Sequence, residues 1–294
     1  IDLLSHAVEL EPAWADPLAQ LALTQQRTIE FGNPTQRRAR AETVKANALR
    51  AIELDPSLSA SYTALAAVQA YHDWDVNAAE ATLRQGLGAA PQDGAAHGRL
   101  AMLLAATGRL SEAVAEGEIA RDREPLVAER HTNLGMIRYY ARDPGGALAD
   151  MDRALAIAPD YGLGHHGRGR ILTALGRYDE AADSLRKALA ISDNAGWWAT
   201  LGVTYARAGR TSDLDAVLRR LRAFEQAGTF VSIDQYAYIA AHQGRLDDAF
   251  RLIEEAIDRR MTNVLWLAVD PRADAMRDDP RFGRLIARMG LVAR

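Results

Sequence analysis

The sequence ALAIAP at residues 154–159 has near copies at regular distances along the chain. AIELDP occupies residues 51–56, ALAISD occupies 188–193, and AVELEP occupies 7–12. The residues that close successive segments of this kind are Pro56, Pro91, Pro125, Pro159 and Asp193, at separations of 35, 34, 34 and 34. A fixed period of this length is typical of a repeat architecture, in which one small unit is stacked many times.

A second marker has the same period. Gly-Arg pairs begin at Gly108, Gly176, Gly209 and Gly244. Between the two markers the small and apolar residues have helical spacing, as in Ala181, Leu185 and Ala188 at i, i+4 and i+7. Each unit is therefore predicted to be an antiparallel pair of helices, because the glycine supplies a left-handed residue that ends the first helix and the proline ends the second.

One such hairpin cannot bury its own apolar stripe, so the sequence predicts an all-α stack with one continuous core. Small residues recur in phase where a first helix must approach its neighbour closely. They are Ala66, Ala101, Gly135, Gly169, Gly202 and Ala237.

Over nearly the whole chain the pattern resembles the tetratricopeptide repeat, whose aromatic–leucine–glycine–tyrosine signature is best kept at Trp198, Leu201, Gly202 and Tyr205. The resemblance implies a right-handed superhelical solenoid of antiparallel helical hairpins with a C-terminal capping helix. The expected divisions are 1–12, the second helix of a truncated repeat; 13–56, an extended repeat with an insertion; 57–262, six repeats; and 263–294, the cap.

Two places depart from the period. From Pro12 to Pro56 there are ten residues too many, and the excess contains the helix breaker at 32–34. We expect a longer hairpin with a protruding turn there. The basic residues Arg37, Arg38 and Arg40 that follow are interpreted as a solvated helix face, with contact to an acidic partner as the alternative. In the next unit, residues 71–75 fill the turn without a glycine and account for one extra residue.

At the C-terminal end, Phe282, Leu285, Ile286 and Met289 are spaced as one apolar face of a capping helix. This ending has Asp-Pro steps at 270–271 and 279–280 and closes on Met-Gly-Leu at 289–291. It is similar, as is the Asp-Trp-Asp turn at 73–75, to tetratricopeptide arrays of multidomain bacterial regulators. In those a winged-helix, adenylate cyclase or serine/threonine kinase domain precedes the array, so the resemblance implies an effector domain upstream of Ile1.

Composition excludes several classes of function. The formal charge is −4 and the basic residues are scattered, so no positive stripe for a nucleic-acid backbone is expected. The chain has no cysteine and no long apolar run, so neither thiolate sites nor membrane contact is predicted. A cytoplasmic location is expected, or a periplasmic one if a missing upstream segment spans the membrane.

No catalytic residues stand out, so we predict that the chain is not an enzyme and carries no cofactor. GLGHHG at 162–167 has the letters of a dinucleotide-binding motif, but it follows the end of a helix instead of a strand. His97, His131 and His165 share one slot in three consecutive repeats. We interpret them as substitutes for an aromatic packing residue and predict no metal; the alternative is that His165 and His166 bind a metal or sense pH.

The family resemblance places the first helix of each hairpin on the concave face, where a protein or peptide partner would bind. Tyr, Met and Arg are enriched at such positions because they dominate binding interfaces. The matching residues are Thr132, Met136, Tyr139, Tyr140, His166, Arg170, Arg207, Tyr238 and His242. In the first two full repeats the slot holds Ala60, Thr63, Ala67 and Ala70, so the groove there is expected to be shallow or filled by another helix.

Two alternatives remain at this point. The chain could be a self-association module that brings upstream effector domains together. An enzyme or an RNA-binding helical repeat would instead need convergent ionisable residues or a basic concave face, and the sequence shows neither.

Overall fold

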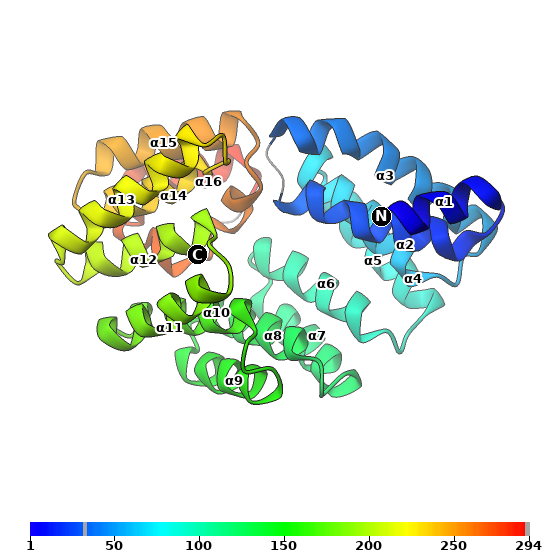
Figure 1. The fold of residues 1–294 in the computed structure, drawn as a ribbon, viewed down its shortest axis with the longest axis horizontal. Coiled ribbons are helices and arrows are strands. Elements are labelled where there is room, and N and C mark those ends of the chain that lie inside the picture. Colours follow the sequence, from blue (N-terminus) through cyan, green and yellow to red (C-terminus); the bar gives the residue numbers. More distant parts are fainter. Residues whose placement is uncertain (32–33, 292–294) are drawn as a thin grey trace.

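The computed structural model describes residues 1–31 and 34–291, and within these ranges the chain is helical with no β-strand (Figure 1). The N-terminal helices are α1 (Asp2–Leu10), α2 (Ala15–Phe31) and α3 (Pro34–Leu54). Six hairpins follow, which confirms the predicted all-α stack. No helix in the described ranges combines the length and the apolarity needed to cross a bilayer.

The first helices of the six hairpins contact one another in succession along the inner side of the stack. They are α4 (Ser59–Val68), α6 (Gly94–Ala106), α8 (Ala128–Tyr140), α10 (Gly162–Ala174), α12 (Ala195–Arg207) and α14 (Ile233–His242). The outer helices are α5 (Val76–Ala89), α7 (Leu110–Arg123), α9 (Pro144–Ile157), α11 (Tyr178–Ile191), α13 (Thr211–Gln226) and α15 (Leu246–Asp258).

The predicted glycines end the inner helices in the left-handed region. Gly108, Gly176, Gly209 and Gly244 have φ between 68° and 80°. Two other turns put a larger residue in the same slot, Trp74 at φ 61° and Arg142 at φ 65°. Such a residue costs about 1–2 kcal/mol relative to ordinary backbone, so both positions call for a compensating contact. Before Trp74, the extra residue of this repeat is absorbed by the π-helical turn η1 (Gln69–Asp73).

Close helix approach explains the small residues in the stack. A Cβ on Gly169 would lie 2.5 Å from Leu185 Cγ, and one on Gly202 would lie 2.8 Å from Ile239 Cδ1. Ala101 and Ala237 have no exposed surface. Any larger side chain at these positions would push neighbouring helices apart.

The stack curls until its C-terminal end meets its N-terminal hairpin, so the ribbon forms an almost closed ring (Figure 1). Arg37, near the start of α3, donates hydrogen bonds to Thr262 Oγ1 at 2.8 Å and to the Arg260 carbonyl oxygen at 2.6 Å. Arg37 is only 4% exposed. The interpretation of the basic cluster as a solvated face is therefore wrong for Arg37, although Arg38 and Arg40 are exposed. Gly32 and Asn33 of the predicted turn lie outside the described residues.

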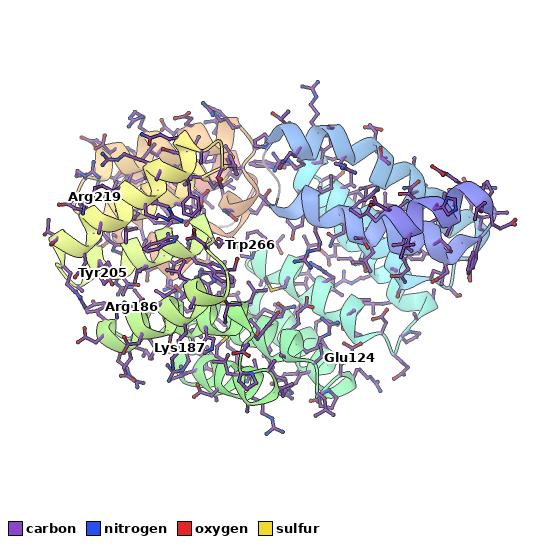
Figure 2. All side chains as sticks on the ribbon, in the orientation of Figure 1. Glu124, Arg186, Lys187, Tyr205, Arg219 and Trp266 are labelled. Carbon is purple, nitrogen blue, oxygen red and sulfur yellow. The ribbon has the colours of Figure 1, made fainter. Side chains whose placement is uncertain are left out.

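The segment after α15 has two parts. The predicted capping helix is α16 (Pro280–Arg288), with Phe282, Leu285 and Ile286 buried. Before it come two 3₁₀ turns, η2 (Thr262–Trp266) and η3 (Pro271–Met276), which contact the inner helices α6 and α14. Figure 2 places Trp266 in the middle of the ring. We call residues 261–277 the inner segment, because it lies on the concave side.

Candidate functional site: the concave face

A buried carboxylate anchors the inner segment to the concave face. Asp270 has no exposed surface, and its Oδ2 accepts hydrogen bonds from Arg170 Nη2 at 2.9 Å and from Arg272 Nη2 at 2.7 Å. Burial alone would raise the pKa of Asp270. The charges of Arg272 and Arg170 and the hydrogen bonds from Arg272 outweigh burial and hold the pKa well below its usual range.

Three tyrosines of the inner helices surround the two arginines. The guanidinium carbon of Arg170 lies 5.1 Å from the ring centre of Tyr139 and 5.6 Å from that of Tyr140. Arg272 lies 4.4 Å from the ring centre of Tyr238. Burial is the largest effect on each tyrosine and raises its pKa, so the rings stay neutral. The positive charges therefore face aromatic surfaces as well as Asp270, which reduces the cost of burying them.

Two more contacts hold η3. The left-handed Arg142 forms a two-bond ion pair with Asp274, with N–O distances of 2.6 and 2.7 Å. His242 Nε2 donates to the Arg272 carbonyl oxygen at 3.1 Å. Burial and the nearby Arg207 charge lower the pKa of His242 to about 4, so its ring is neutral near pH 7.

The same kind of contact holds η2. Trp266 stacks on Tyr71 with ring centres 6.1 Å apart, and the guanidinium of Arg260 lies 5.9 Å from the ring centre of Trp74. Thus Trp74, Arg142 and Arg260, the non-glycine residues of the described chain with positive φ, all take part in seating the inner segment or the end of α15. Their backbone strain is concentrated where the ring closes.

Of the nine residues predicted for partner binding, Tyr139, Tyr140, Arg170, Tyr238 and His242 meet on the inner segment. The others lie beside it. Thr132 is buried, and its Oγ1 has no hydrogen-bond partner among the described residues. Met136 packs near Gly167 on α10.

His166 stacks on Trp197 at 5.7 Å and hydrogen-bonds Thr200 at 2.9 Å. Burial, then the charges of Arg170 and Arg272, lower the pKa of His166 well below its ordinary value. Arg207 is half-buried and acts on His242 through its charge. The structure thus gathers most of the predicted set, but around a segment of the chain itself.

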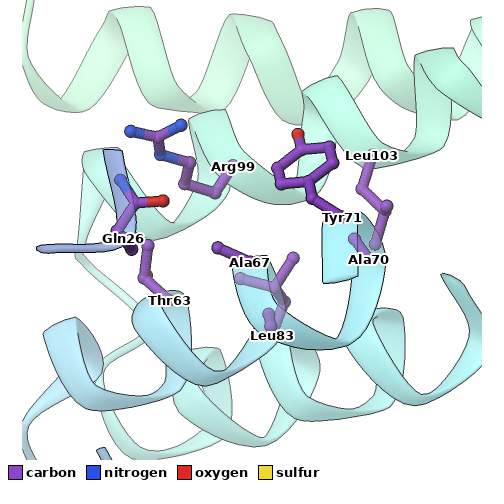
Figure 3. A pocket seen from close by; sticks show the side chains of 9 residues that line it. Gln26, Thr63, Ala67, Ala70, Tyr71, Leu83, Arg99 and Leu103 are labelled. Carbon is purple, nitrogen blue, oxygen red and sulfur yellow. The ribbon is translucent and has the colours of Figure 1, made fainter. Parts of the chain in front are cut away.

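The N-terminal half of the concave face holds a small hollow between α2, α4 and α6 (Figure 3). Most of the side chains that line it are buried. Ala67, Ala70 and Leu83 form its floor, with Gln26 and Arg99 at one side. Gln26 is 1% exposed, and its Oε1 has no hydrogen-bond partner among the described residues. An unpaired buried amide oxygen favours any ligand that brings an N–H donor.

The three histidines that share one slot in consecutive repeats bind the loops between repeats. His97, His131 and His165 each hydrogen-bond, through Nε2, the carbonyl oxygen of the loop proline six residues earlier, at 2.8–3.2 Å. Tyr62 makes the same contact to Pro56 at 3.1 Å. Within the described ranges no group of three metal-ligating side chains converges. These residues tie each loop to the next inner helix.

Sequence reasoning missed the partners supplied by the C-terminal segment, chiefly Trp266, Asp270 and Arg272, and it missed Gln26. A signal was present for the first three. Val264, Leu265, Leu267 and Val269 form an apolar stretch without helical spacing, and all four are buried. Such a stretch outside the repeat pattern indicates a segment that must be covered by the stack.

Comparisons with known proteins agree with this geometry. A family model described as "Tetratricopeptide repeat" matches residues 75–127 and 132–196. No curated protein matches the sequence. A tetratricopeptide repeat protein from Parabacteroides merdae is 12% identical, with 85% of this chain and 97% of that chain covered and a TM-score of 0.56.

Two further solved structures have the same fold. PilF from Pseudomonas aeruginosa is 19% identical, covering 72% of this chain and 97% of its own, with a TM-score of 0.54. The Cut9 and Hcn1 hetero-tetramer of the APC/C matches at 13% identity over 86% of this chain and 45% of that chain, with a TM-score of 0.61. The chain thus has the fold of a tetratricopeptide-type solenoid.

Proposed function

We propose that this solenoid holds a segment of a partner protein on its concave face and is the interaction arm of a larger bacterial regulatory protein. The observation that carries the proposal is the hollow between α2, α4 and α6, where Gln26 offers a buried, unpaired amide oxygen. A peptide main chain would supply the N–H group that this oxygen lacks once the Gln26 side chain, which is 1% exposed, turns toward the groove. We propose no catalytic role and no cofactor.

The inner segment supports the proposal because it shows how the concave face holds a stretch of chain that is not part of a repeat. A mostly irregular stretch of chain is held on the concave face by the arginine and tyrosine side chains that dominate protein interfaces. The partner would occupy the part of that face which the inner segment leaves open. Thr132, Met136, His166 and Arg207 are proposed as further partner contacts. Tyr139, Tyr140, Arg170, Tyr238 and His242 would act by seating the inner segment that borders the partner.

The role as an arm of a regulator rests on the resemblance of the Asp-Pro ending and of the 73–75 turn to arrays in multidomain regulators. Partner binding by this architecture is also named for one structural neighbour, the Cut9 and Hcn1 assembly. The partner of the present chain would be a protein segment of different sequence, since that neighbour shares only the fold.

Filling the hollow tests the proposal. Ala67→Leu places a larger side chain in the hollow, and Gln26→Ala removes the unpaired amide. A pull-down from a bacterial lysate should recover a partner with the unchanged chain and lose at least tenfold of it with either variant. Ala81→Leu, on the exposed side of α5, is the matched control and should retain the partner. Equal recovery by all four chains would place partner binding elsewhere.

A second candidate, self-association, is favoured by one observation. α1 has no buried residue, and Leu3 and Leu10 on it are 87% and 70% exposed, with Trp14 beyond it at 55%. If this apolar surface joins two copies, Leu3→Asp with Leu10→Asp should convert a dimer to a monomer in sedimentation velocity. A monomer at all concentrations before substitution would exclude this candidate.

A further inference from the structure

The last junction between repeats is built differently from those before it. At the earlier junctions, α5, α7, α9 and α11 each pack against the inner helix that follows. α13 makes only sparse contact with α14. Its connection spans residues 227–232 and turns at Gly228 (φ 77°), whereas the two junctions before α10 use residues 124–127 and 158–161.

The separation leaves a cleft between α13 and α15. The two helices lie at the upper left of Figure 1. It encloses about 700 Å³, including open solvent, and is the larger of the two hollows described here. Ile239 and Ala240 of α14 form its floor, and each is 1% exposed. The half-buried Leu218 and Leu252 stand on opposite walls. The interior is therefore an apolar trough bounded by two helices.

The rim of the cleft is positively charged. Arg222 lies on the α13 wall, and Arg245 and Arg251 lie on the α15 side. One acidic residue, Asp248, shares the cleft and is paired with both Arg245, at 2.9 Å, and Arg251, at 3.6 Å. Arg222 is exposed and makes no ion pair with any described residue. Three guanidinium groups stand against Asp248 and against Glu225, which interacts with Tyr236 of the cleft lining, so one positive charge remains in excess around the apolar floor.

From these features we infer that the cleft is a second docking surface, which binds an amphipathic helix with an acidic flank. A helix laid in the trough would pack its apolar side on α14, as the outer helices pack on the following inner helix at the other junctions. Its acidic side chains would meet the unpaired Arg222 and the excess charge of the α15 wall. This surface is separate from the concave face, so the inference does not depend on the proposed function.

The probe is a synthetic 18-residue helix with leucines at i, i+3, i+4 and i+7 and glutamates on both flanks, labelled for fluorescence anisotropy. We expect the full chain to bind it, and Arg222→Glu with Arg251→Glu to weaken binding at least tenfold. Both substituted residues are exposed, so the fold should survive, as a thermal melt will show. A version of the peptide with lysines for glutamates should bind the substituted chain better than the unchanged one.

Two controls separate docking from general attraction. Arg219 lies on the exposed side of α13 (Figure 2). Arg219→Glu changes the charge outside the cleft by the same amount as Arg222→Glu alone changes it inside, and it should leave binding within twofold. A peptide of the same composition with its leucines scattered should bind at least tenfold more weakly. Absence of binding, equal binding of the scattered peptide, or an equal loss with Arg219→Glu would each overturn the inference.

Discussion

The two halves of the concave face differ in what covers them. In the C-terminal half, the large side chains Tyr139, Arg170 and Tyr238 are buried against the inner segment. In the N-terminal half, the same inner positions hold the small residues Thr63, Ala67 and Ala70, which are buried beside α2, and only a small hollow remains. Aromatic and arginine side chains in a solenoid groove therefore mark a surface that is built to be covered, and here the chain itself supplies the cover.

The largest expected effect comes from removing Asp270, which holds the inner segment on the C-terminal half of the concave face. Asp270→Ala removes the carboxylate that neutralises Arg170 and Arg272 and leaves two guanidinium groups buried without a counter-charge. We expect a loss of about 3–5 kcal/mol in the free energy of unfolding. Urea denaturation followed by tryptophan fluorescence measures it, because Trp266 lies in the inner segment.

Asp274→Ala is the matched control for this change. The change removes the ion pair of Asp274 with Arg142, in which both side chains are almost half exposed, and its ion pair with Arg277 at 2.8 Å. Asp274 itself is almost half exposed, so the loss should not exceed about 2 kcal/mol. Similar losses for the two variants would mean that burial of Asp270 does not set the strength of the anchor.

The repeat fold could be predicted because it depends on signals inside each unit of the period. Gly108 and Gly176 end inner helices where expected, and Gly169 and Gly202 sit at close helix contacts. The left-handed turn, the proline stop and the helical spacing are all properties of short stretches of sequence. Repetition then multiplies a weak local signal into a reliable one.

Closure of the ring could not be predicted in the same way. Arg37 and Thr262 meet across 225 positions of sequence, and nothing local to either residue indicates the other. The inner segment lies outside the repeat period, so the position of Asp270 relative to Arg170 had no pattern behind it. The candidate set on the concave face was therefore identified from its residue types, while its intramolecular cover was missed.

A smaller decrease in the free energy of unfolding is expected at acidic pH, through His242 in the C-terminal half of the concave face. His242 is neutral in the folded chain down to pH about 4, whereas in the unfolded chain it binds a proton near its ordinary pKa of about 6.5. Above pH about 6.5 His242 is neutral in both states and does not affect the pH dependence. As the pH falls from about 6.5 toward 4, proton uptake by the unfolded chain alone lowers the free energy of unfolding. By linkage the loss is about 1–3 kcal/mol.

His242→Gln keeps a donor for the Arg272 carbonyl and cannot take up a proton, so it should reduce the drop in stability between pH 7.5 and pH 4.5. Urea denaturation at the two pH values measures the difference. His6→Gln, at an exposed site on α1, is the control and should leave the drop unchanged. A drop of the same size in His242→Gln would assign the acid sensitivity to other groups, such as the buried His166.

The smallest effect tests whether strain in the turn of Arg142 is balanced by its contact. Arg142→Gly relieves a left-handed residue, worth about 1 kcal/mol, and removes the half-exposed pair with Asp274, worth up to about 1 kcal/mol. The two terms nearly cancel, so the free energy of unfolding should stay within about 1 kcal/mol of the original.

Gly176→Arg is the control, because it puts the same side chain in the next repeat's left-handed slot, at φ 74°. It has no such partner to gain, so it should lose about 1–2 kcal/mol in urea denaturation. A loss above 2 kcal/mol in Arg142→Gly would instead mean that this ion pair secures η3 more strongly than a surface pair can. In that case the seating of the inner segment would depend on the exposed ion pair between Arg142 and Asp274 as much as on Asp270.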